Sequence, residues 1–78
     1  MRAEKYNIFI ETADGASTKV RYGFGAAGEE VQQILEIPGT VRVRVHIDGE
    51  QPEVVFETTR AWRLVDIKQR IKGLSFEQ

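Results

Sequence analysis

Side chains suited to catalysis or metal binding are few and far apart in this 78-residue chain. His46 is the single histidine and there is no cysteine, so a site with several histidine or thiolate ligands is excluded. Asp48 follows two positions later and should share a strand face with His46, which gives at most two ligands. Ser17 and Ser75 lack the sequence context of a catalytic nucleophile. We therefore predict no metal, no cofactor and no enzymatic activity.

A glycine-rich segment at residues 23–28, Gly-Phe-Gly-Ala-Ala-Gly, matches the G-x-G-x-x-G pattern of dinucleotide-binding folds. Such folds need parallel strands buried on both faces, whereas the strands on either side of the motif carry charges at alternate positions. The chain also has no room for the second half of a nucleotide crevice. We interpret the motif as a bend that leads from a strand into a closely packed helix. The alternative is that the amides of Gly25 and Gly28 hold a phosphate or carboxylate of a partner.

The strictest alternation of apolar and polar residues lies at residues 40–48 and predicts a strand with one buried and one solvated face. A sheet with one solvated face is normally antiparallel and covered by helices on one side. The same alternation assigns these residues to the core: Val41, Val43, Val45, Ile47, Ile8, Ile10, Val20, Tyr22, Phe24, Val54 and Phe56. The solvated face then carries the candidate binding residues Phe9, Arg21, Arg42, Arg44, His46 and Val55. Cross-strand ion pairs are expected on that face with Glu11, Glu53 and Glu57.

Periodicity and turn residues divide the chain into six elements. Strands are predicted at residues 6–11, 19–24, 40–48 and 53–57, and helices at residues 26–37 and after a cap at Thr58 or Thr59. The predicted fold class is α+β: a two-layer sandwich of ββαββα order, in which a four-stranded, mainly antiparallel sheet carries two helices on one face. All 78 residues form one domain in this prediction. A β-grasp-like arrangement, with the first and third strands parallel, is the alternative topology.

The composition is typical of a globular protein, with 41% hydrophobic and 29% charged residues. The formal net charge of -1 gives no overall attraction to nucleic acid or to anionic membranes. No apolar run approaches the roughly 20 residues that span a bilayer, and the first residues lack the apolar core of a signal peptide. Together with the lack of cysteine, these features predict a soluble cytoplasmic protein.

The leading functional hypothesis is a non-enzymatic protein-binding module, a small regulatory inhibitor, adaptor or subunit that uses the solvated sheet face. The alternative is nucleic-acid binding, by the arginines of that face or by the last helix. The basic residues of that helix region are Arg60, Arg63, Lys68, Arg70 and Lys72. Because a small chain gains stability by associating, and edge strands can pair, a homodimer is a further expectation.

Overall fold

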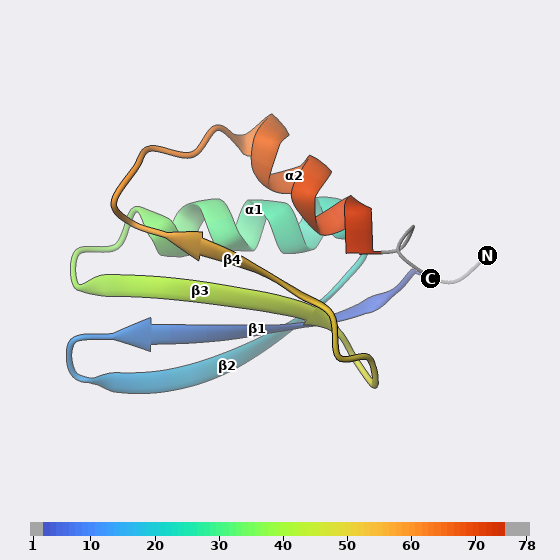
Figure 1. Cartoon of the computed structure of the whole chain (residues 1–78), viewed down its shortest axis with the longest axis horizontal. Coiled ribbons are helices and arrows are strands. Elements are labelled where there is room, and N and C mark those ends of the chain that lie inside the picture. Colours follow the sequence, from blue (N-terminus) through green and yellow to red (C-terminus); the bar gives the residue numbers. More distant parts are fainter. Residues whose placement is uncertain (1–2, 75–78) are drawn as a thin grey trace.

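The computed structural model describes residues 3–74, in which four strands form a sheet that carries two helices on one face (Figure 1). The strands are β1 (Lys5–Thr12), β2 (Gly15–Tyr22), β3 (Thr40–Ile47) and β4 (Glu53–Glu57), and the helices are α1 (Phe24–Leu35) and α2 (Leu64–Gly73). The predicted α+β class and ββαββα order are confirmed. Within residues 3–74, neither helix has the length and apolarity needed to cross a membrane.

The strand order in the sheet is β2-β1-β3-β4, and each neighbouring pair is antiparallel. β1 and β3 are the two central strands and run in opposite directions, so the β-grasp-like alternative is wrong. β2 and β3 point the same way with β1 between them, because α1 carries the chain back across the helix-covered face before β3 begins (Figure 1). The sheet has no parallel neighbours, which agrees with its one-sided cover of helices.

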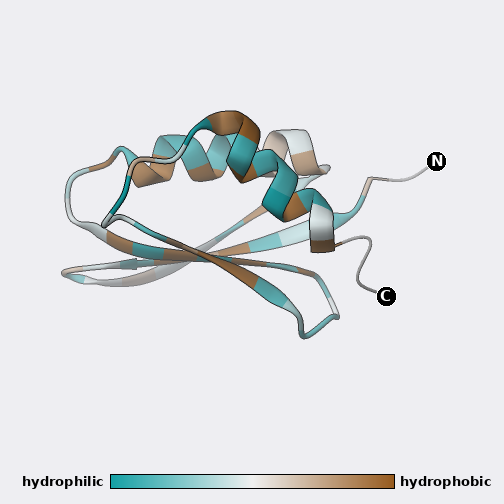
Figure 2. Cartoon of the chain, turned by 45° about the horizontal axis from the view of Figure 1, so that its top comes forward, coloured by the Kyte–Doolittle hydropathy of each residue, from teal (hydrophilic) through white to brown (hydrophobic). Residues whose placement is uncertain are grey.

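One hydrophobic core fills the space between the sheet and the two helices. β1 contributes Tyr6, Ile8 and Ile10 from alternate positions, and all three are buried. The other buried hydrophobic residues are Ala27, Val31, Ile34, Val43, Val45, Ile47, Phe56, Ile67, Ile71 and Leu74. Hydrophobic and hydrophilic segments alternate along the strands and both helices in Figure 2, as expected for elements with one buried face.

The facing of β2 differs from the prediction. Ala13 and Asp14 form a two-residue hairpin loop, since Thr12 pairs with Gly15. This register places Arg21 opposite Tyr6 and Val20 opposite Asn7. Because Tyr6 is buried under the helices, Arg21 lies on the helix-covered face, while Val20 and Tyr22 lie on the opposite one. Assigning Val20 and Tyr22 to the core was therefore wrong, and Tyr22 is 62% exposed.

The pairing of β3 with β1 is irregular at the start of β3. This irregularity changes which residue is buried at that end of the strand. Glu11 pairs with Arg42 and Thr12 pairs with Thr40, so Val41 has no partner on β1. Thr40 turns inward, is 7% exposed and donates its hydroxyl to the Ile34 carbonyl at the end of α1 (3.0 Å). Val41 is 50% exposed, so its predicted place in the core was wrong. The buried hydroxyl is satisfied by this hydrogen bond to the Ile34 carbonyl, which also accepts the Ile37 amide (3.0 Å).

The glycine-rich segment forms the bend into α1 and its contact with α2. Gly23 has φ 89, in the left-handed region, and its amide donates to the Glu4 carbonyl (2.8 Å). A Cβ atom added at Gly28 would lie 2.6 Å from Cγ of Lys68 on α2, whereas one at Gly25 would meet nothing within 4 Å. These two roles agree with the interpretation of the motif as a bend into a closely packed helix. Phe24, predicted in the core, begins α1 and is 40% exposed.

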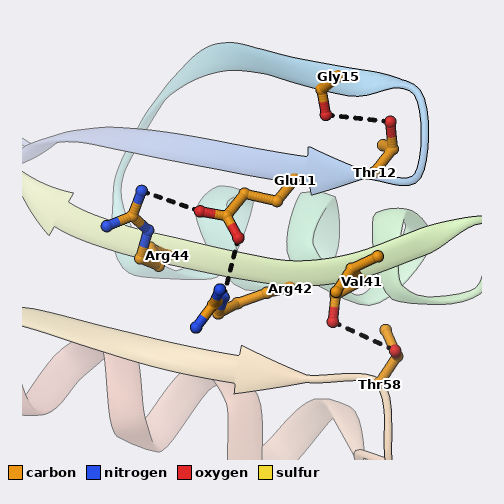
Figure 3. A network of polar contacts seen from close by, with 7 residues as sticks. All are labelled: Glu11, Thr12, Gly15, Val41, Arg42, Arg44 and Thr58. Atoms are coloured by element: carbon orange, nitrogen blue, oxygen red, sulfur yellow. Dashed lines mark hydrogen bonds and ion pairs between the residues drawn. The ribbon is translucent and has the colours of Figure 1, made fainter.

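α2 begins at Leu64 after Arg63, which makes no side-chain capping hydrogen bond, so the predicted threonine caps were wrong. Thr58 instead donates its hydroxyl to the Val41 carbonyl (3.2 Å; Figure 3). Trp62, in the segment before α2, packs edge-to-face with Phe56, with ring centroids 5.0 Å apart. Its indole N–H donates to the Glu57 carbonyl (2.8 Å). The connection from β4 to α2 is thus fixed to the sheet by side chains.

The two glycines of α1 provide a matched test of helix packing. We expect Gly25→Ala to leave stability unchanged or raise it by up to about 1 kcal/mol, because alanine is the better helix former. Gly28→Ala should be less stable than Gly25→Ala by about 1 to 3 kcal/mol, because the new methyl group displaces the buried part of Lys68. Urea unfolding followed by circular dichroism measures both. Equal stabilities would contradict the close contact of α1 with α2.

Candidate functional site

The sheet face opposite the helices, termed the open face, is not covered by either helix (Figure 1). The pairing registers place these residues on it: Lys5, Asn7, Phe9 and Glu11 from β1; Ala16, Thr18, Val20 and Tyr22 from β2; Arg42, Arg44 and His46 from β3; Glu53, Val55 and Glu57 from β4. Five of the six candidate binding residues lie there, as expected: Phe9, Arg42, Arg44, His46 and Val55. Whether they bind a partner stays a prediction.

Arg21 is the candidate that the structure places elsewhere. Its Nη2 lies 2.7 Å from Glu30 Oε1 on α1, and its Nη1 donates to the Val20 carbonyl (2.7 Å). Lys19, also on the helix-covered face, brings its Nζ to 3.2 Å from Glu30 Oε2. The Glu30 side chain is only 12% exposed, so two cations surround a carboxylate that is mostly shielded from water. Arg21 therefore joins the edge of the sheet to α1 and is not part of the open face.

Phe9, Arg44 and Val55 form the central row of the open face. Arg44 pairs with Phe9 on one side and with Val55 on the other. Its guanidinium carbon lies 4.5 Å from the centroid of the Phe9 ring, a cation–π contact. Arg44 Nε is buried and has no hydrogen-bond partner within the described part of the chain. The row thus combines an aromatic ring, an aliphatic side chain and an arginine that is already held in place.

Glu11 connects the two arginines of β3. One carboxylate oxygen lies 2.9 Å from Arg42 Nε and the other lies 3.0 Å from Arg44 Nη2 (Figure 3). The predicted ion pairing of Glu11 is confirmed. The register also sets Glu57 opposite Arg42 and Glu53 opposite His46. The positive charge of the arginines is therefore balanced by carboxylates on the same face, which leaves little attraction for phosphate groups.

His46 is tied to the loop that follows β3. Its Nδ1 lies 3.1 Å from the Ile47 carbonyl oxygen and 3.1 Å from the Glu50 carbonyl oxygen. Carbonyl oxygens only accept, so Nδ1 carries the proton and Nε2 holds the lone pair when the ring is neutral. Asp48 accepts a hydrogen bond from Asn7 Nδ2 (2.9 Å) and lies 3.8 Å from Lys5 Nζ. Among residues 3–74, no group of three or more metal-ligating side chains could hold an ion.

Sequence reasoning missed two residues of the open face, Val20 and Tyr22, because it assigned them to the core. The sequence of β2 alternates cationic and apolar residues, so either set could face the helices. The signal that could have decided between them is the length of the hairpin loop. A two-residue loop at Ala13 and Asp14 sets Thr12 against Gly15 and fixes every later pair. Val20 and Tyr22 therefore add two apolar side chains to the open face, opposite Asn7 and Lys5 of β1.

Comparison with known proteins gives no match from which a function could be inferred. No family model matches the chain, no curated protein matches it, and no solved structure matches it.

The double ion pair of Glu11 should contribute measurably to stability. We expect Glu11→Gln to lower the free energy of unfolding by about 0.5 to 1 kcal/mol, since all three partners keep some solvent exposure. The loss should shrink when the salt concentration rises from about 0.05 M to about 1 M. Urea titrations at both concentrations measure it, with Glu4→Gln as a control because Glu4 is exposed. A loss that is the same in both variants would contradict the network.

The tautomer of His46 follows from its two carbonyl neighbours. We expect the neutral ring to carry its proton on Nδ1, the less common form of free imidazole, because Nδ1 faces two acceptors. A two-dimensional ¹H–¹⁵N correlation of the ring nitrogens, recorded where the ring is neutral, distinguishes the two tautomers directly. A proton on Nε2 would contradict the placement of the loop after β3.

Proposed function

We propose that this chain is a non-enzymatic protein-binding module that uses the open face of its sheet. The observation that carries the proposal is the central row of Phe9, Arg44 and Val55 on a face that neither helix covers. Aromatic residues and arginine are the side chains enriched at the energetic centre of protein interfaces. Polar and charged residues surround the row, in the usual arrangement of a polar rim around an apolar centre.

The rigidity of the row also favours protein binding. Arg44 is held by the Phe9 ring on one side and by the Glu11 carboxylate on the other. An arginine that is fixed before binding loses less conformational entropy when a partner covers it. Two further apolar side chains, Val20 and Tyr22, lie on the same face along the β2 edge. A partner that covers this face would thus meet a preformed surface.

The charges of the open face favour a protein over nucleic acid. Nucleic-acid affinity comes largely from cations that neutralise phosphates, and Glu11 already pairs with both Arg42 and Arg44. The Phe9 ring, which would have to stack on a base, has Arg44 over it. Nucleic-acid binding by the basic last helix stays the alternative, since five of the eleven basic residues and one of the twelve acidic residues fall in residues 60–73.

A pull-down from a lysate of the native host tests the proposal. We expect the tagged full chain to retain a protein in stoichiometric amount after nuclease treatment. Phe9→Ala should weaken its capture by about tenfold or more, because the ring lies at the centre of the face and its loss also frees Arg44. Ile37→Ala is the matched control: it removes an exposed apolar side chain, 56% accessible, from the loop between α1 and β3. Circular dichroism confirms that each variant is folded.

Each other outcome would change the proposed partner or the proposed site. Recovery of nucleic acid that is lost at raised salt would favour the alternative. A captured protein that is unaffected by Phe9→Ala would place its site elsewhere. Capture of only a second copy of the chain, checked by light scattering, would make the open face a dimer interface.

A further inference from the structure

A hollow on the helix layer, termed the α2 groove, lies away from the open face. It has a volume of about 520 Å³ and is lined by Phe24, Leu64, Val65, Lys68, Gln69 and Lys72. Phe24 is the first residue of α1, and the other five belong to α2. None of these six residues lies on the open face, so a ligand of the groove would not compete with a partner of the sheet.

The floor of the α2 groove is apolar and exposed. Phe24 is 40% exposed and Val65 is 51% exposed. They are two of the five exposed large hydrophobic side chains within the described residues, the others being Tyr22, Ile37 and Val41. Phe24 and Val65 thus present two exposed apolar side chains to a ligand on one concave surface.

The shape of the groove favours a helical occupant. Its α2 residues at positions 64, 65, 68, 69 and 72 form one stripe that follows the helix for about two turns. The groove is lined by helix residues and offers no strand edge, so an extended peptide would find no backbone partners there. A helix satisfies its own backbone groups and needs only apolar side chains to fill such a groove.

The charge around the groove favours an acidic occupant. Lys68 and Lys72 lie one turn apart on the same side of α2, and Lys72 Nζ is 5.3 Å from the Phe24 ring centroid. The nearby carboxylate of Glu29 is 3.6 Å from Lys68 Nζ, with both side chains partly exposed. Such a pair is weak, so a partner's carboxylate can replace it at little cost. The rest of the chain, outside residues 60–73, has eleven acidic and six basic residues. Residues 60–73, which include α2, are therefore a local cationic region.

We infer that the α2 groove binds an amphipathic helix of a protein partner, whose apolar stripe fills the groove and whose flanking Asp or Glu residues pair with Lys68 and Lys72. A second copy of this chain fits less well, because two α2 helices placed face to face would bring like charges together. Nucleic acid and anionic lipid would satisfy the lysines but make poorer use of the Phe24 and Val65 contacts. This inference does not depend on the role of the open face.

Selection from a displayed library of random peptides of about 15 residues, roughly four helical turns, tests the inference without assuming a sequence. The full chain is the target. We expect the enriched peptides to carry apolar residues at helical spacing, flanked by Asp or Glu. One enriched peptide is then synthesised with a fluorescent label, and its affinity for the full chain is measured by anisotropy.

The two exposed valines provide matched variants for the affinity measurement. Val65→Glu should weaken binding by about tenfold or more, because it places a carboxylate in the apolar floor. Val41→Glu, at a side chain that is equally exposed (50%) but outside the groove, should change it by less than about twofold. Lys72→Gln should weaken binding by about two- to fivefold. Circular dichroism verifies that all three variants are folded.

Other results would overturn the inference. These are no enrichment, enriched peptides without acidic residues or helical spacing, or binding that Val65→Glu leaves intact. Vesicles containing phosphatidylserine and a short DNA duplex are tested in parallel. Binding of either probe that Val65→Glu abolishes, without any selected peptide, would assign the groove to a membrane surface or to nucleic acid instead. None of these results bears on the open face, where Phe9→Ala is the diagnostic variant.

Discussion

The antiparallel pairing of β1 with β3 determines what every other part of the chain can do. It aligns Ile8 with Val45 and Ile10 with Val43 on one side of the sheet, and Phe9 with Arg44 on the other. The first set creates the apolar surface on which both helices pack, and the second set creates the centre of the open face. A shift of this register by one residue would exchange the two faces. The core and the candidate binding surface are thus two consequences of one pairing.

The two helices share this surface because they approach each other closely at one point. Gly28 of α1 has no side chain, so the aliphatic part of Lys68 on α2 can lie against it. Lys68 thereby reaches Glu29 with its ammonium group, while Val65 and Lys72 line the groove that α2 forms with Phe24 at the start of α1. Gly28, which belongs to a motif resembling a nucleotide-binding fingerprint, thus serves helix packing. The same contact leaves one side of α2 available to a partner.

The sequence predicted the fold correctly where a local pattern of apolar and polar residues was compatible with only one arrangement. The alternation of β3 correctly placed Arg42, Arg44 and His46 on the solvated face. The same alternation wrongly placed Val41 in the core, because a pairing irregularity with β1 buries Thr40 instead. That irregularity depends on how β1 pairs with β3, which the sequence of β3 alone does not reveal. In β2 the alternating residues fit either face, and the facing is set by the hairpin loop and by the ion pairs with Glu30 on α1. Strand order was not predictable, since it depends on where α1 crosses the sheet.

The dimensions of the molecule limit how the open face can be used. The chain extends 36 × 23 × 18 Å, so a face that includes the long axis has an area on the order of 600 to 800 Å², close to one partner's share of a standard protein interface. A partner that binds with ordinary affinity would therefore cover the face from Tyr22 on the β2 edge to Val55 on β4. The charged pairs of Glu11, Arg42 and Asp48 would then lie at its rim, where they influence the rate and specificity of association more than its strength. The α2 groove is far smaller and suits a single helix, so the two surfaces call for partners of different kinds.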